Sequence, residues 1–154
     1  MTDPLDETRP ALNVSTAKAC SLELIQRLLD RVPRESLAPA EAQPAPVGAV
    51  ARTLHPGIIP GTKRYPGTAA VCVRNPVLAD QHTTEIVAWL AQRPGWVELE
   101  RYLDEEHPRY RSPEGYEVSV SALRPNEGFP MVCINTISPD FVPPATHHQA
   151  TSRY

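Results

Sequence analysis

Proline restricts the fold of this chain more than any other residue type, because it terminates helices and is disfavoured in central strands. The chain contains 18 prolines in 154 residues, about twice the ordinary proportion. Pro33 and Pro94 each end a segment with helical periodicity, and three Pro-Gly pairs interrupt residues 55–67. We therefore expect the proline-rich stretches to form stiffened loops between the helices and strands.

Composition and charge narrow the class of protein. Hydrophobic residues make up 41% of the chain, near the globular average, and 154 residues suit one domain. Fifteen basic and 18 acidic residues give a formal net charge of -3, which argues against general nucleic-acid binding. The acidic N-terminus has no apolar core, and no apolar run approaches the ~20 residues needed to cross a bilayer. We expect no signal peptide, no membrane insertion and a cytoplasmic or assembly-associated location.

Hydrophobic periodicity predicts two helices. The first lies within residues 15–33, with Thr16 or Ser21 as its N-cap, and Pro33 ends it. The second begins at Asp80 as its N-cap and ends at Pro94. The buried faces of these helices are expected to comprise Leu24, Ile25, Leu28, Ile86, Trp89 and Leu90.

Apolar runs and alternating patterns predict five strands, at residues 47–54, 68–75, 97–103, 116–123 and 131–138. We expect Val118, Val120 and Ile134 to face the core, and Gly128 to take the left-handed position in the loop before the last strand. The order α-β-β-α-β-β-β predicts an α+β protein. Its two helices are expected to pack on one face of a largely antiparallel sheet of about five strands.

We expect a single α+β domain over residues 15–142. Residues 1–14 are polar and contain two prolines, which predicts a disordered N-terminal segment. Residues 33–46 are rich in proline and alanine, which predicts a semi-rigid linker inside the domain. Residues 143–154 are expected to form a C-terminal tail.

Residues 55–67, with the sequence HPGIIPGTKRYPG, are the most ligand-like stretch of the chain. The first two glycines are one residue too close for a phosphate-binding P-loop, and the lysine does not follow a glycine. Pro-Gly pairs instead favour type II turns, in which the glycine has a positive φ. We therefore expect a stiffened surface loop that contacts a protein partner. The predicted partner-binding residues are Ile58, Ile59, Lys63, Arg64 and Tyr65.

The cysteines and one histidine are the candidate catalytic residues of the chain. Three cysteines without Cys-x-x-Cys spacing predict reduced structural thiols, with Cys72 and Cys133 as the pair to expect under oxidising conditions. Cys72, His82 and Asp80 come nearest to a nucleophile, a base and a carboxylate. However, we expect Cys72 to be buried in a strand and His82 to lie in the exposed first turn of a helix. No catalytic residues, no metal and no cofactor are predicted.

Three stretches of the chain resemble a known class of proteins. They are the helix opening ACSLELIQRLLDRVP, the helix exit QRPGW and the last strand leading into SPDF. Over residues 20–139 they are similar to small uncharacterised actinobacterial α+β proteins, many of them lipoprotein-like. Asp140 stands where that class would have a cysteine. The resemblance implies no activity.

The leading hypothesis is a non-catalytic protein–protein interaction module. Such a module would be a subunit or accessory of a larger assembly, such as a virion. Its partner would be another protein or a second copy. The hypothesis rests on the missing catalytic constellation and on the proline-stiffened loops at 33–46 and 55–67. Two alternatives remain: a small hydrolase or transferase that uses Cys72 and His82, and a carrier that binds a small ligand on the sheet face opposite the helices.

Overall fold

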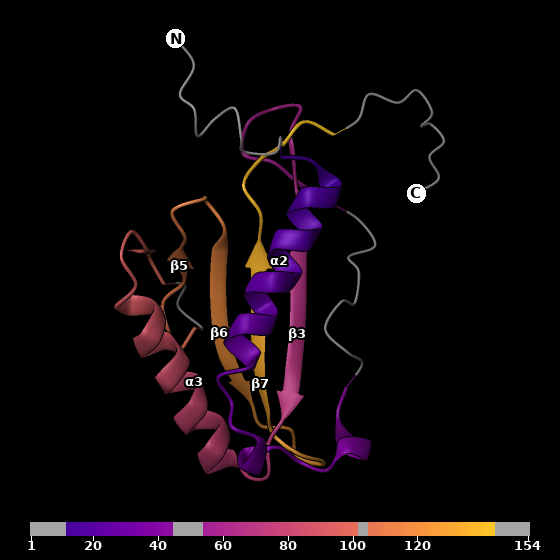
Figure 1. Cartoon of the computed structure of the whole chain (residues 1–154), viewed down its shortest axis with the longest axis vertical. Helices are drawn as coiled ribbons and strands as arrows, with labels where there is room; N and C mark the ends of the chain where they lie inside the picture. The colour runs from indigo at the N-terminus through magenta and orange to yellow at the C-terminus, as the bar shows by residue number, and fades with distance from the viewer. Residues whose placement is uncertain (1–11, 45–53, 102–104, 144–154) are drawn as a thin grey trace.

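The computed structural model describes residues 12–44, 54–101 and 105–143. Two α-helices cover one face of a five-stranded antiparallel sheet with the strand order β3-β7-β6-β5-β4, and a small hairpin, β1–β2, lies at one end (Figure 1). The predicted α+β class is confirmed. The elements are α2 (Val14–Leu29), the 3-10 helices η1 (Arg34–Ser36) and η2 (Ala40–Ala42), β1 (His55–Pro56), β2 (Lys63–Arg64), β3 (Pro66–Cys72), α3 (Pro76–Ala91), β4 (Val97–Glu98), β5 (Tyr110–Arg111), β6 (Glu117–Leu123) and β7 (Met131–Ile137).

Helix α2 begins earlier than predicted, with Asn13 as its N-cap instead of Thr16 or Ser21. The Asn13 side chain accepts a hydrogen bond from the backbone N–H of Thr16 at 2.9 Å. The Thr16 hydroxyl in turn accepts one from the backbone N–H of Asn13 at 2.8 Å. This reciprocal capping box satisfies two backbone donors at the helix start. It places Asn13 and Val14, which were predicted to be disordered, in the ordered domain.

Helix α3 also begins earlier than predicted, because Asn75 and not Asp80 is its N-cap. The Asn75 side chain accepts a hydrogen bond from the backbone N–H of Leu78 at 2.9 Å. Pro76 occupies the first helical position, where its fixed φ suits the helix and its missing N–H is not needed. Asp80 lies inside the helix and forms an ion pair with Arg124 at 2.7 Å.

Strands β6 and β7 confirm the predicted alternation. Val118 and Val120 are buried on the helix-facing side of β6, while Ser119 between them is only partly buried on the other side. Val120 pairs with the buried Ile134 of β7 in the antiparallel register. Gly128 in the connecting loop has a φ of +90°, as predicted for the left-handed position.

The other strands differ from the prediction. Of the strand predicted at 97–103, the described residues 97–101 form only β4, and β5 lies in a stretch that was predicted to be a loop. Pro108 and Pro113 flank β5 and limit it to two residues, too few for a visible period-2 pattern. The strand predicted at 47–54 lies outside the described residues, apart from its last position.

The hydrophobic core lies between the two helices and the sheet. Gly67 in β3 allows α2 to approach, because a Cβ atom there would lie 2.7 Å from Thr136 Oγ1 and 3.1 Å from Ile25 Cδ1. Among the predicted core positions, Leu24 and Trp89 are partly buried and pack against the core. The fully buried predicted positions are Ile25, Leu28, Ile86, Leu90, Val118, Val120 and Ile134.

Residues 33–44 pack against the end of β3 and do not form the predicted linker. The backbone N–H of Ala38 donates to the carbonyl of Cys72 at 2.9 Å. The Gln43 side chain accepts from the N–H of Cys72 at 2.9 Å and donates to its carbonyl at 3.0 Å. β3 is an edge strand, so its outer backbone groups need partners, and this segment supplies them.

Candidate functional site

The hairpin β1–β2 presents the loop that was predicted to contact a partner. We call residues 57–62 the hairpin loop. The backbone N–H of Thr62 donates to the carbonyl of Ile59 at 3.1 Å, and Gly61, which follows Pro60, has a φ of +86°. This is the predicted type II turn. The other two Pro-Gly pairs contain no glycine of positive φ, so only the middle pair forms such a turn.

Asp140, which follows β7, accepts hydrogen bonds from the backbone of the hairpin loop and so holds it in place. The backbone N–H groups of Ile58 and Ile59 donate to its carboxylate at 3.0 Å and 2.9 Å. Next to it, Phe141 forms two backbone hydrogen bonds with Lys63, at 2.8 Å and 2.9 Å. The hydrogen bond from Ile59, followed by the one from Ile58, lowers the pKa of Asp140 because both stabilise the charged carboxylate. The hairpin loop is therefore fixed by groups that lie far away in the sequence.

Three apolar side chains in these two segments are exposed. Ile58 is 77% exposed, Ile59 is 61% exposed and Val142, which follows Phe141, is 73% exposed. We call Ile58, Ile59 and Val142 the hairpin patch. Single exposed apolar residues are ordinary, but several on two paired segments are more typical of a contact surface. The exposure predicted for the two isoleucines is confirmed.

Tyr65 does not belong to this surface, and its predicted exposure is wrong. It is 2% exposed and packs with Ala17 and Phe141 in a second, smaller core. Arg64 is partly buried, and its guanidinium lies 3.9 Å from the carboxylate of Glu117. Tyr65 lies between β2 and β3, and its ring is on the side of Ala17 and Phe141.

His82 is buried, and its predicted position in an exposed first turn is wrong. Because α3 begins earlier than predicted, His82 lies farther along the helix and faces η1. Its Nε2 is 2.8 Å from Ser36 Oγ, and its Nδ1 is 2.9 Å from the Glu85 carboxylate. Cys72 lies on the opposite face of the sheet, and Asp80 is paired elsewhere. The Cys72–His82–Asp80 constellation is therefore not formed.

The hydrogen bonds from Ser36 through the imidazole to Glu85 have the connectivity of a catalytic triad. However, Ser36 is buried, and the neighbouring cavity of about 410 Å³ is lined by Pro33 and Leu37 but not by Ser36. Glu85 is exposed, so water competes for its carboxylate. A hydroxyl that substrate does not reach is not a nucleophile. The arrangement is best explained as a structural link between η1 and α3 that satisfies both ring nitrogens.

The cysteines are free, as predicted for reduced thiols. Cys72 and Cys133 are buried on neighbouring strands, β3 and β7. Burial raises the pKa of both thiols, and the neighbouring Cys72 raises the pKa of Cys133 further. A raised pKa leaves little reactive thiolate at neutral pH, which fits a packing role. Cys20 differs from these two because it is exposed on α2.

Neither a metal-ligating cluster nor a membrane-spanning helix among the described residues points to a function. No group of three or more metal-ligating side chains occurs within residues 12–44, 54–101 and 105–143. No helix in the described part of the chain has the length and apolar character needed to cross a membrane. Comparisons with protein-family models, with curated proteins and with solved structures found no match. The functional argument therefore rests on the geometry of the described residues.

We expect acid to release the hairpin loop. The pKa of Asp140 is lowered in the folded protein, so its hold on the loop is complete above the ordinary aspartate pKa. It is lost as the pH falls through the lowered value, below about pH 4. In an NMR titration, the backbone amide resonances of Ile58 and Ile59 should shift together at that pKa. Asp140→Asn should abolish this titration, and amide positions that never respond to pH in the wild type would contradict the proposed hold.

Proposed function

We propose that the protein is a non-catalytic protein–protein interaction module that binds its partner through the hairpin patch. The observation that carries this proposal is the exposure of Ile58 and Ile59 side by side on a turn that Asp140 holds. Covering this apolar surface supplies a hydrophobic driving force of about 25 cal/mol per Å², from which the entropic cost of association is subtracted. Apolar side chains on a fixed surface loop are typical of binding sites.

The stiffness of the hairpin loop supports this function. Pro60 and the hydrogen bonds to Asp140 restrict the backbone before a partner arrives, so little conformational entropy is lost on binding. Lys63 is partly exposed beside the loop and supplies a positive charge that can orient an acidic group of the partner. Arg64 and Tyr65 are engaged inside the protein, so they leave the proposed contact set.

The size of the surface suggests the kind of partner. Three exposed side chains form a small patch, which suits one contact among several in a larger assembly better than an isolated tight complex. The partner we propose is a protein with a complementary apolar surface, either another subunit or a second copy. A cytoplasmic or assembly-associated location is part of the same proposal.

The test replaces both isoleucines by serine. Ile58→Ser with Ile59→Ser should weaken association by about tenfold or more, because two apolar contacts are lost. The fold should be retained, since both side chains are exposed. The measurement is the native mass of the protein purified from its own source, which also identifies a homo-oligomer by a multiple of the chain mass.

The matched control is Val77→Ser. Val77 is 72% exposed, but it lies at the start of α3, at the end of the molecule opposite the hairpin (Figure 1). The control should keep the partner, and thermal unfolding should be similar for all three proteins. Retention of the partner by the folded double variant would refute the hairpin patch as the contact surface.

A further inference from the structure

A cavity of about 300 Å³ lies on the helix-covered side of the sheet, and none of its lining residues belongs to the hairpin patch. It is formed by α2, by residues 93–96 that follow α3, and by the turn at 112–116 that joins β5 to β6. The apolar part of its wall includes Leu24 and Trp96. Its volume lies at the lower end of the range for small-molecule sites, about 300–1,000 Å³.

Four charged side chains line this cavity, two of each sign. They are Arg27 and Arg93, and Glu23 and Glu114. None of the four lies within ion-pair distance of an opposite charge on any residue that the structure describes. Charges of both signs beside one small cavity suit a ligand that carries both signs itself.

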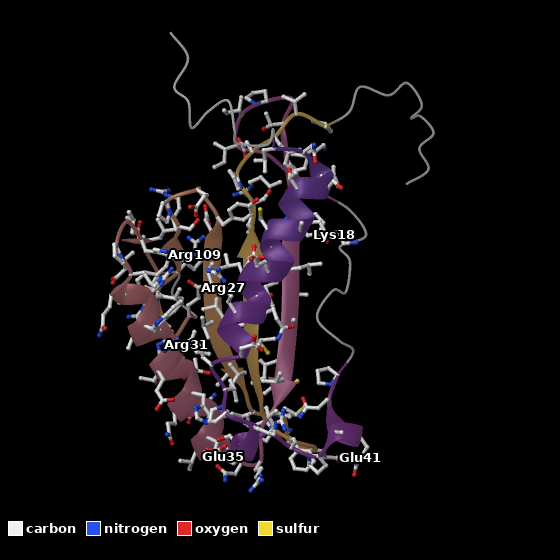
Figure 2. All side chains as sticks on the ribbon, viewed as in Figure 1. Lys18, Arg27, Arg31, Glu35, Glu41 and Arg109 are labelled. Carbon is white, nitrogen blue, oxygen red and sulfur yellow. The ribbon has the colours of Figure 1, made fainter. Side chains whose placement is uncertain are left out.

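One of the two cavity-lining arginines, Arg93, packs on an aromatic ring. The guanidinium of Arg93 lies 4.5 Å from the centre of the Trp89 ring, and that of Arg31 lies 4.3 Å from it. This contact orients Arg93 without neutralising its charge. Its Nε is buried and has no hydrogen-bond partner in the described part of the chain. Figure 2 shows Arg27 and Arg31 on the side of α2 that faces α3.

Tyr116 contributes a buried hydroxyl to the same site. Its side chain lines the cavity and is only 6% exposed. Its hydroxyl has no hydrogen-bond partner of good geometry among the described residues, and the neighbouring Cys20 thiol is a weak one. Burial first, and then Cys20, raises the pKa of Tyr116, so the hydroxyl stays protonated and remains a donor at neutral pH. A ligand oxygen would satisfy this donor.

We propose that this cavity binds a free α-amino acid or a similar small zwitterion with an apolar side chain. The ligand's carboxylate contacts the two arginines, its ammonium group contacts the two glutamates, and its side chain lies against Leu24 and Trp96. The site is distinct from the sheet face on which a carrier was expected to bind its ligand. It is also independent of the hairpin patch, because the two share no residue.

Tryptophan fluorescence tests this proposal directly, because the chain contains two tryptophans: Trp96 lines the cavity, and Trp89 contacts the guanidinium of the cavity-lining Arg93. Titration with L-phenylalanine or L-leucine should give a saturable change. Binding should be weaker by about tenfold or more for 3-phenylpropionate, which lacks the ammonium group, and for phenethylamine, which lacks the carboxylate. Equal binding of either half-ligand would overturn the zwitterion assignment. The site would be overturned if neither amino acid gave a saturable change at millimolar concentrations.

Variants separate this site from the rest of the surface. Arg27→Gln should weaken L-phenylalanine binding by about tenfold, since a charged hydrogen bond is lost. Lys18→Gln removes the same charge from the other side of α2 (Figure 2) and should bind like the wild type. The Ile58→Ser, Ile59→Ser variant should also bind normally, so the two proposals can fail separately. Wild-type affinity in folded Arg27→Gln would overturn the assigned role of that arginine.

Discussion

Replacing Tyr65 by alanine is expected to lower the free energy of unfolding by about 3–5 kcal/mol, the range for a buried aromatic cut back to a methyl group. Tyr65 is 2% exposed and fills the small core with Ala17 and Phe141. That core joins the start of α2 to the segment that carries Asp140. The loss should therefore also loosen the hairpin loop, and urea unfolding measures the change in stability.

Tyr65→Phe is the matched control for this substitution. The Tyr65 hydroxyl is buried and has no hydrogen-bond partner among the described residues, so its removal should be neutral or slightly stabilising. A large loss in Tyr65→Phe would reveal a partner for the hydroxyl that the described residues do not include. A loss below about 1 kcal/mol in Tyr65→Ala would contradict the burial of the ring.

Replacing Leu28 by alanine is expected to cost about 2–5 kcal/mol of unfolding free energy. Leu28 is fully buried between α2 and the sheet, in the larger core. The substitution removes apolar contacts and leaves a cavity that the packed helix and sheet only partly close. Leu123→Ala is the control, because Leu123 is 48% exposed at the end of β6 and should cost less than about 1 kcal/mol. Similar losses in the two variants would contradict the assigned core.

Local pattern was sufficient to predict the helices and the two long central strands. The apolar stripe that contains Ile25 and Leu28, and the alternation around Val118 and Val120, depend only on 3.6- and 2-residue periods. These elements are long enough for their periodicity to be recognised without tertiary information. The start of α3 could also have been predicted from the local sequence, because Asn is favoured at the N-cap and Pro at the first helical position. The prediction chose Asp80, another favoured N-cap residue, in place of Asn75.

Short elements and loops were predicted less well, because distant segments determine them. β5 has only two residues, and its strand character comes from pairing with β4 and β6. Residues 33–44 resemble a linker in composition, yet the unpaired edge of β3 holds them against the sheet. Backbone hydrogen bonds of this kind join residues that are far apart in the chain, so no local sequence pattern predicts them.

The candidate sites show the same division. The sequence alone predicted the α+β class from its hydrophobic periods, and the type II turn at Pro60-Gly61 with the exposed Ile58 and Ile59 from the turn preference of the Pro-Gly pair. Only the tertiary structure decided that Tyr65 turns into a core and that Asp140 holds the hairpin loop. It also brought the charged residues of α2 beside those that follow α3 and β5, which lie more than 60 positions away. The physical reason is that burial and long-range hydrogen bonds depend on which segments fold against each other, and that pairing is a property of the whole chain.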